Sequence, residues 1–183
     1  MSYLALDIET AGVDPEEHSI LEVGAVIDNG DPIEDLPTYQ RQIHNDTVIG
    51  QRRSLEMASE NGLLNSDLPS VKPKHFAASL KGWLVDEGFC DSPFGRDYIT
   101  VAGKNAATFD IPFLKEQMPH FTDAFCVRAR VLDPTTLYYK LQEERPPTLD
   151  ECLERAGIEE PVDHTALSDA LQVVRLIRNA KQQ

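Results

Sequence analysis

The sequence is poor in cysteine and has no long apolar run. Its 183 residues include only 3 cysteines. Cys90, Cys126 and Cys152 are odd in number and lack Cys-x-x-Cys spacing, which argues against a disulfide framework and a zinc site. We expect them to be reduced and structural. No stretch approaches the ~20 apolar residues that span a bilayer, and the N-terminus lacks the features of a signal peptide. These absences predict a soluble, cytoplasmic protein without membrane contact.

Positive charge is also scarce. Lysine and arginine number 17 against 31 aspartates and glutamates, which gives a formal net charge of −14. Affinity for phosphates usually comes from clustered lysine and arginine, so a long basic groove for nucleic acid is excluded. Carboxylates that bind divalent cations do not act as free negative charge, and such cations can reverse the local field. If the substrate is nucleic acid, we therefore expect a short footprint.

The length and the 41% hydrophobic content fit one globular domain over residues 1–183. Apolar runs bounded by turn residues predict an antiparallel meander, with strands at 3–9, 19–28 and 38–43. Further along, we predict short strands at 99–102 and 128–132 and helices at 53–59, 74–86, 111–117, 135–141, 149–156 and 166–180. A capping box at 148–151 and Gly157 mark the ends of one of these helices. The order predicts an α/β fold whose mixed central β-sheet is flanked by helices.

Two acidic residues close the first predicted strand. Side chains alternate along a strand, so Leu4, Leu6 and Ile8 share one face while Asp7 and Glu9 share the other. Carboxylates at i and i+2 stand roughly 7 Å apart, close enough to hold a divalent cation. A frayed strand end whose acids face water has the same local pattern, so this segment alone leaves both interpretations open.

The last predicted helix carries a third acidic residue. At 100° per residue Asp169 aligns with Val173 and Leu176, on a largely apolar side of the helix. An unpaired carboxylate there is costly, so it must meet a metal, a hydrogen-bond donor or a cation; a salt bridge or a helix-start acid is the alternative. Another stripe of the helix is expected to face water and comprises Ser168, Gln172, Arg175 and Asn179.

Two more polar residues are candidates for the same site. His164 precedes Asp169 in a loop that can fold the imidazole over it, although a lone loop histidine is usually a surface residue. Asp110 follows the predicted strand 99–102 and opens a predicted helix, where aspartate is also a good N-cap. Neither residue is diagnostic by itself.

Taken together, these residues resemble the DEDDh group of 3′-to-5′ exonucleases, the DnaQ-like family with a ribonuclease H-like fold. The first motif is matched by 7–10 with 20–25, the second by Asn105 with 109–114, and the third by 164–170. Order and spacing agree over nearly the whole chain, but 45–98 holds nothing diagnostic. Lys104 departs from the histidine that many members carry, and one more residue precedes Phe109. This departure concerns how the terminal nucleotide is held, since a lysine is a mobile point charge suited to a phosphate.

The resemblance implies roles for individual residues. It implies two divalent cations, Mg²⁺ or Mn²⁺, about 4 Å apart around the scissile phosphate. The metal ligands implied are Asp7, Glu9, Asp110 and Asp169. His164 would take the proton from the attacking water near neutral pH. The substrate-binding residues implied are Thr10, Asn105 and Phe109, and the products are nucleoside 5′-monophosphates.

Several functions remain open at this stage. The first is a 3′-to-5′ exonuclease on single-stranded DNA, and the second is an exoribonuclease or oligoribonuclease that uses the same site. A third is a nuclease fold retained as a binding module without catalysis, although all five catalytic positions are present. An unrelated metal-dependent hydrolase is a fourth. A homodimer or an association with a polymerase is not readable from the sequence.

Overall fold

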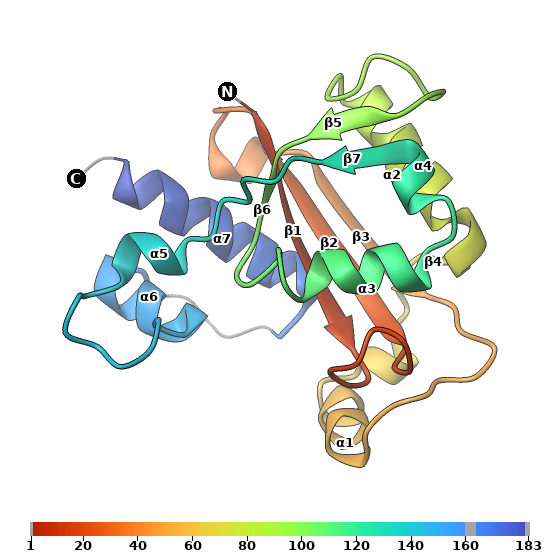
Figure 1. The fold of residues 1–183 in the computed structure, drawn as a ribbon, viewed down its shortest axis with the longest axis horizontal. Helices are drawn as coiled ribbons and strands as arrows, with labels where there is room; N and C mark the ends of the chain where they lie inside the picture. The colour runs from red at the N-terminus through yellow and green to blue at the C-terminus, as the bar shows by residue number, and fades with distance from the viewer. Residues whose placement is uncertain (1, 160–163, 182–183) are drawn as a thin grey trace.

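The centre of the protein is a mixed five-stranded sheet, seen in the computed structural model, which describes residues 2–159 and 164–181 (Figure 1). The strand order is β4-β3-β2-β1-β6. The antiparallel meander predicted from the sequence is confirmed, with strands β1 (Tyr3–Thr10), β2 (Ile20–Asp28) and β3 (Thr38–Ile43). Two short strands, β4 (Ser70–Val71) and β6 (Val101–Ala102), add in parallel at the two edges.

Alternation along β1 sends its side chains into two different cores. Leu4, Leu6 and Ile8 join the core on one face of the sheet, and Tyr3 and Ala5 join the core on the other. The predicted partition of β1 into two faces is therefore correct. Both faces of the strand are covered, so the backbone around Asp7 and Glu9 is fixed from both sides.

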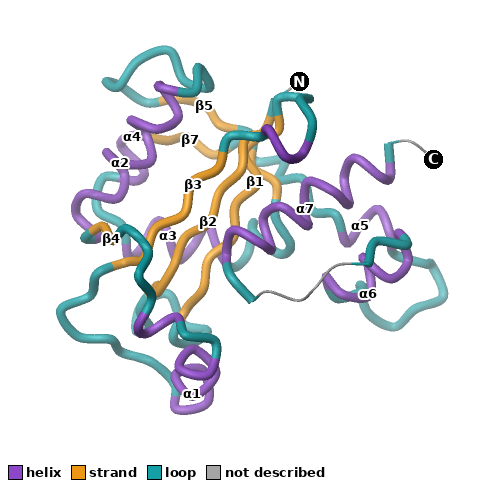
Figure 2. Tube along the Cα trace, turned by 180° about the vertical axis from the view of Figure 1, so that it is seen from behind, coloured by secondary structure: helices purple, strands orange, loops and turns teal. Residues whose placement is uncertain are grey.

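Helices cover the two faces of the sheet (Figures 1 and 2). One face packs against α2 (Pro73–Asp86), α3 (Asp110–Gln117) and α4 (Phe121–Ala124). The other packs against α7 (Ala166–Ala180), whose bounds match the predicted helix. A further helix, α1 (Arg52–Glu60), and the short 3-10 turns η1 (Ile33–Asp35) and η2 (Leu63–Asn65) lie in the connections.

Helix α7 is enclosed by a second layer, formed by α5 (Thr135–Tyr138) and α6 (Leu149–Ala156). The Tyr138 hydroxyl donates to the carbonyl of Leu176 at 2.9 Å. As predicted, a capping box begins α6 and Gly157, in a left-handed conformation, ends it. Because α7 is covered on two sides, Gln172 is only 3% exposed, and the prediction that its stripe faces water is wrong at that residue.

Beyond the main sheet, β5 (Asp97–Ile99) and β7 (Phe125–Val127) form a parallel two-stranded ribbon. The predicted strand at 99–102 is thus two strands, divided at Thr100. The predicted strand at 128–132 is wrong. The ribbon already ends at Val127, and Leu132 makes only an isolated bridge to Ala102.

The three cysteines are free, as expected from their number and spacing. Cys90 and Cys152 are buried, whereas Cys126 is partly exposed. Among the described residues, no helix combines the length and the apolar character needed to cross a membrane.

Candidate functional site

Three of the predicted acidic residues meet at a hollow beside β1. Asp7, Glu9 and Asp169 each present a carboxylate oxygen, and these oxygens lie within 4.8 Å of one another. The hollow has a volume of about 450 Å³. We call it the acidic hollow; it is lined by Asp7, Ile8, Glu9, Lys104, Asn105, Thr108, Phe109, Asp110, Leu149 and Asp169. The structure therefore brings together residues from both ends of the sequence.

Asp110 lines the acidic hollow without belonging to the group of three. It is the first residue of α3, and its Oδ1 accepts a hydrogen bond from the backbone N–H of Ile8 at 3.1 Å. The N-cap of α3 is Phe109, which makes no side-chain cap, so the alternative of an N-cap aspartate is wrong. Asp110 is only 3% exposed and instead joins α3 to β1.

The carboxylates that line the acidic hollow outnumber its positively charged side chains among the described residues. Burial raises the pKa of Asp7 well above its usual range, and the charges of Asp110, Asp169 and Glu9 raise it further. Burial together with neighbouring carboxylates, Asp169 first, raises the pKa of Glu9 to about 7. Burial also raises the pKa of Asp110 to about 7, despite the hydrogen bond from Ile8. The ammonium group of Lys104 opposes these shifts at Asp7 and Asp110.

This donor set fits divalent cations. Carboxylate oxygens are the ligands of hard ions such as Mg²⁺, Mn²⁺ and Ca²⁺, whereas structural zinc sites favour cysteine and histidine. A cation would offset the repulsion that raises the pKa values of Asp7 and Glu9. The close group of Asp7, Glu9 and Asp169 would hold it, and Asp110 stands beside them on the same wall.

Glu22 holds the helix that carries Asp169. It is 2% exposed, and its Oε1 accepts from the backbone N–H of Ala166 at 3.0 Å and from Nε2 of Gln40 at 2.9 Å. Beside it, Gly24 leaves room for the helix, because an added Cβ would lie 2.2 Å from the backbone carbon of Ala166. The first turn of α7 is thus fixed on β2, which places Asp169 next to Glu9.

The other predicted site residues divide into two groups. Asn105 and Phe109 line the acidic hollow, and Asn105 adopts a positive φ of 56° while its N–H donates to Asp133 at 3.0 Å. Thr10 does not line it, and its hydroxyl donates to the carbonyl of Gly12 at 2.6 Å. His164 is exposed, immediately before the N-cap of α7, and is not among the lining residues either.

Some features of the site lie beyond the sequence prediction. Thr108 and Leu149 line the acidic hollow, but they come from a turn and a helix start, where no periodic pattern points to a site. Glu22 had no role assigned to it, although an acidic residue inside the fully buried β2 is the signal that it needs a partner. Lys104, the departure from the family pattern, is the only cationic side chain among the described lining residues.

Comparison with known proteins gives similarity of structure rather than of sequence. The sequence matches no protein-family model and no curated protein. A structure of exonuclease I superposes with a TM-score of 0.69 at 14% identity, covering 100% of this chain and 41% of that chain. The zinc-bound complex of Escherichia coli exonuclease I with single-stranded DNA gives 0.67 at 15% identity, covering 100% and 41%. The catalytic unit of Neurospora crassa Pan2, a protease and nuclease domain, gives 0.62 at 18% identity, covering 99% and 27%.

These similarities confirm the predicted fold, an α/β arrangement of the ribonuclease H-like type with a mixed sheet between helices. The chain spans about 41% of the length of the exonuclease I chains that it resembles. At such low identities the likeness concerns the path of the backbone, and the chemistry depends on the residues of the acidic hollow.

Proposed function

We propose that this chain is a metal-dependent 3′-to-5′ exonuclease that releases nucleoside 5′-monophosphates from single-stranded nucleic acid, with DNA favoured. The observation that carries the proposal is the group of three carboxylates within 4.8 Å of one another, in a hollow that also contains Asp110 and Lys104. Exonuclease folds among the similar structures support it. Complexes of those proteins with single-stranded DNA support DNA as the substrate.

The proposed ligands are the four acidic residues of the hollow, and we propose two Mg²⁺ or Mn²⁺ ions. When bound, such ions would make a water nucleophilic and offset the negative charge of the phosphate and of the leaving 3′-oxygen. The protein's part is to hold the carboxylates in place. Asp7 and Glu9 are fixed by β1, Asp110 by its bond to Ile8, and Asp169 by the first turn of α7.

We propose a role in proton transfer for one further residue and a role in phosphate binding for another. We propose that the imidazole of His164 takes the proton from the attacking water, because histidine is the side chain that most often serves as a general base near neutral pH. His164 lies next to the start of α7, the helix that carries Asp169. We propose that the ammonium group of Lys104 binds a non-bridging phosphate oxygen of the terminal nucleotide. It already lies close enough to the acidic residues to lower the pKa of Asp7 and of Asp110.

We propose that the 3′-terminal nucleotide contacts Phe109 and Asn105. Phe109 lines the acidic hollow and packs against Phe113 with ring centroids 4.9 Å apart, which holds its ring as a stacking surface for a base. Asn105 presents its side chain from a turn fixed by Asp133. Thr10 is assigned a weaker role, as a positioning group at the end of β1.

The proposal is tested with single-stranded DNA and RNA oligonucleotides labelled at either end and incubated with the purified protein and Mg²⁺ or Mn²⁺. We expect mononucleotides to appear first from the 3′ end, faster from DNA, and no release in EDTA. Products appearing from the 5′ end first would contradict the assignment, and faster release from RNA would reassign the sugar preference.

Asp7→Asn is the decisive variant, because it removes the charge of one ligand with little change in volume. We expect metal-dependent release to fall by at least about 10³-fold while the circular dichroism spectrum stays unchanged. Asp67→Asn makes the same chemical change on an exposed loop and should keep full activity. Full activity in Asp7→Asn would refute the metal assignment.

A further inference from the structure

A second hollow, outside the acidic one, lies on the ribbon formed by β5 and β7. Its volume is about 700 Å³. We call it the arginine hollow; the side chains that matter here are Tyr98, Thr100, Cys126, Arg128, Arg130 and Leu132. It contains no carboxylate among its lining residues, in a protein whose net charge is −14. Positive charge concentrated on an acidic protein indicates a specific anionic partner.

Neither guanidinium of the arginine hollow is used by the fold. Within the described residues, Arg128 and Arg130 are exposed and form no ion pair, whereas Arg155 and Arg178 each bind a carboxylate. The guanidinium of Arg128 lies over the ring of Tyr98, whose centroid is 5.5 Å from the guanidinium carbon. Tyr98 is itself 68% exposed, so arginine and aromatic ring stand together at the surface.

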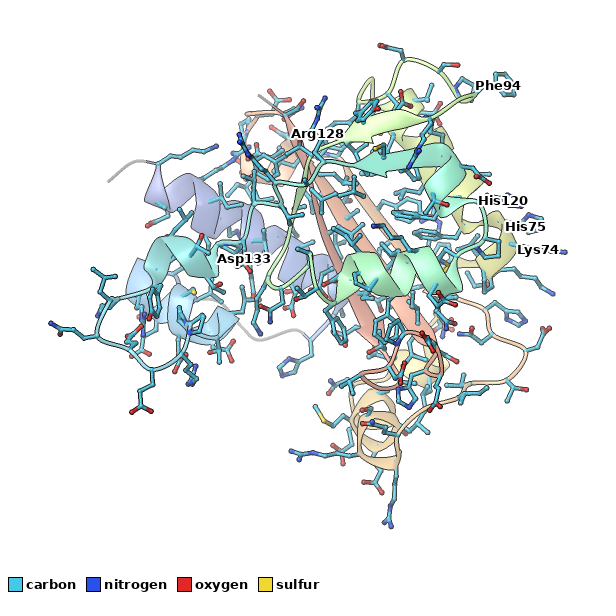
Figure 3. The ribbon with its side chains drawn as sticks, viewed as in Figure 1. Lys74, His75, Phe94, His120, Arg128 and Asp133 are labelled. Carbon is cyan, nitrogen blue, oxygen red and sulfur yellow. The ribbon has the colours of Figure 1, made fainter. Side chains whose placement is uncertain are left out.

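The backbone hydrogen bonds on either side of residues 129–131 explain why Arg128 and Arg130 are exposed. Directly after the end of β7, the N–H of Arg128 donates to the carbonyl of Ile99 at 2.9 Å. The N–H of Leu132 donates to the carbonyl of Val101 in β6 at 2.9 Å. The residues between, 129–131, join these two points and carry Arg130 outward. Figure 3 labels Arg128 at one end of this segment and Asp133 at the other, where the chain turns toward α5.

The arginine hollow and the acidic hollow lie near the two ends of the short strand β6. Thr100 precedes β6 and lines the first, and Lys104 follows β6 and lines the second. Four residues of extended chain span about 13 Å, so Thr100 and Lys104 are at most that far apart. At most about four phosphates of a nucleic acid strand span this length. A strand whose 3′ end lies in the acidic hollow can therefore reach the arginine hollow a few nucleotides upstream.

We propose that the arginine hollow binds the single-stranded nucleic acid a few nucleotides on the 5′ side of the scissile bond. Arg128 and Arg130 pair with phosphates, and a base stacks on Tyr98. This inference rests on the proposed function, because that function places the 3′ end of the strand in the acidic hollow. It explains how a protein with so few positive charges holds a polyanion, through one local contact rather than a basic groove.

The test compares a thymidylate dinucleotide with an oligothymidylate of about 12 nucleotides. The one internucleotide phosphate of the shorter strand lies in the acidic hollow, which leaves no upstream phosphate for the arginines. In Arg128→Gln/Arg130→Gln, we expect fluorescence anisotropy to show weaker binding of the longer strand, on the order of tenfold, and unchanged binding of the shorter one. The plot of log K against log salt should be less steep by about 1.4, since each phosphate contact on a single strand contributes ~0.7. In hydrolysis, KM for the longer strand should rise while kcat stays constant.

Lys72→Gln/Lys74→Gln is the matched control, because it removes two exposed positive charges at the start of α2. It should bind both strands as the wild type does. If Arg128→Gln/Arg130→Gln binds the longer strand like this control, or weakens both strands equally, the proposal is overturned. Anisotropy needs no turnover, so a wild type that binds with length dependence but hydrolyses nothing would refute the proposed function alone.

Cys126 provides a second measurement on the unmodified protein. Its thiol lines the arginine hollow and is partly exposed, whereas Cys90 and Cys152 are 6% and 0% exposed. The longer strand should slow alkylation of Cys126 by a maleimide, and the shorter strand should not. Unchanged alkylation at saturating long strand would overturn the proposal. Protection that instead increases with protein concentration alone would show that a second copy of the chain covers this surface, and would overturn it too.

Discussion

Asp7 and Glu9 occupy positions where their charge is unfavourable unless a cation is present. Desolvation and the surrounding carboxylates raise the pKa of both residues, that of Glu9 to about 7. The fold thus holds together groups that repel one another, because the backbone of β1 stays paired with β2 as far as Glu9. Electrostatic repulsion among clustered carboxylates is typical of sites that function with a bound cation.

This repulsion predicts how stability depends on pH when metal is absent. The pKa of Glu9 is raised from 4.5 in the unfolded chain to about 7, so the folded state binds more protons between these values. The stabilisation is fully present below about 4.5 and is lost as the pH rises through about 7. In EDTA we therefore expect the melting temperature to fall from pH 5 to pH 8, as measured by calorimetry.

Two controls define that experiment. Adding Mg²⁺ at pH 8 should restore the melting temperature, because an ion that binds only the folded state stabilises it. Asp7→Asn should show a weaker pH dependence in EDTA and a smaller response to Mg²⁺. A melting temperature that stays level or rises across this range in EDTA would show that the carboxylates are not held in mutual repulsion.

His164 is the second residue whose role can be isolated. His164→Ala should slow hydrolysis by about 10² to 10⁴-fold at neutral pH while leaving Mg²⁺ binding nearly unchanged, because it removes the proposed general base and none of the proposed ligands. Rates measured with saturating Mg²⁺, with and without added imidazole, would check this, since imidazole should restore part of the loss. A variant as fast as the wild type would assign the proton to another group.

At the scale of elements, the position of α7 on β2 decides the geometry of the site. Gly24→Ala would place a methyl group 2.2 Å from the backbone of Ala166, so the start of α7 must move away and carry Asp169 with it. Such overpacking costs about 1 to 3 kcal/mol. We expect a lower free energy of unfolding in urea and a larger loss of activity than this destabilisation explains.

Gly82→Ala is the matched control for that change. Gly82 lies inside α2, where an added Cβ meets nothing within 4 Å. The substitution should stabilise the protein by about 0.5 to 1 kcal/mol, since alanine is the better helix former, and leave activity unchanged. If Gly24→Ala behaves like Gly82→Ala, the position of α7 on β2 does not determine the geometry of the site.

The elements also show which features a sequence can predict. The meander of β1 to β3 and the helix α7 were predicted nearly to the residue, because each is long and has a clear periodicity. Short elements such as β4, α4 and β7 were missed or misplaced, because two to four residues carry no period and depend on tertiary pairing. Gln172 was misplaced for a similar reason, since the second layer over α7 leaves no signal in α7 itself.

The candidate site was likewise predictable where a local pattern or the resemblance pointed to a residue, and not where its role depends on a distant partner. Alternation placed Asp7 and Glu9 on one face of β1. Helical periodicity singled out Asp169, and the resemblance then linked it with Asp110. All of these residues line one hollow. Thr10 and His164 do not line it, so their roles stay predictions. The role of Glu22 depends on Ala166, a partner far away in the sequence, and no local pattern could indicate that pairing.

At the scale of the whole molecule, the net charge of −14 opposes the approach of a nucleic acid. The Debye length falls from ~30 Å at about 0.01 M salt to ~8 Å at about 0.15 M, so added salt should screen the repulsion. We expect the association rate constant of a labelled oligonucleotide, measured by stopped flow in EDTA, to rise severalfold over this range. A basic nucleic-acid-binding protein shows the opposite trend. A rate that falls would mean that the arginine hollow dominates the encounter.

The acidic hollow joins β1, at the start of the described chain, to α7, near its end. During synthesis on the ribosome, the meander of β1 to β3 emerges before α7 and can pair early, because its contacts are local. Asp169 and the helix that positions it emerge more than a hundred residues later. The group of three carboxylates is therefore incomplete until α7 has been made, so under the proposed function a chain cut before α7 should neither bind the metal tightly nor release nucleotides.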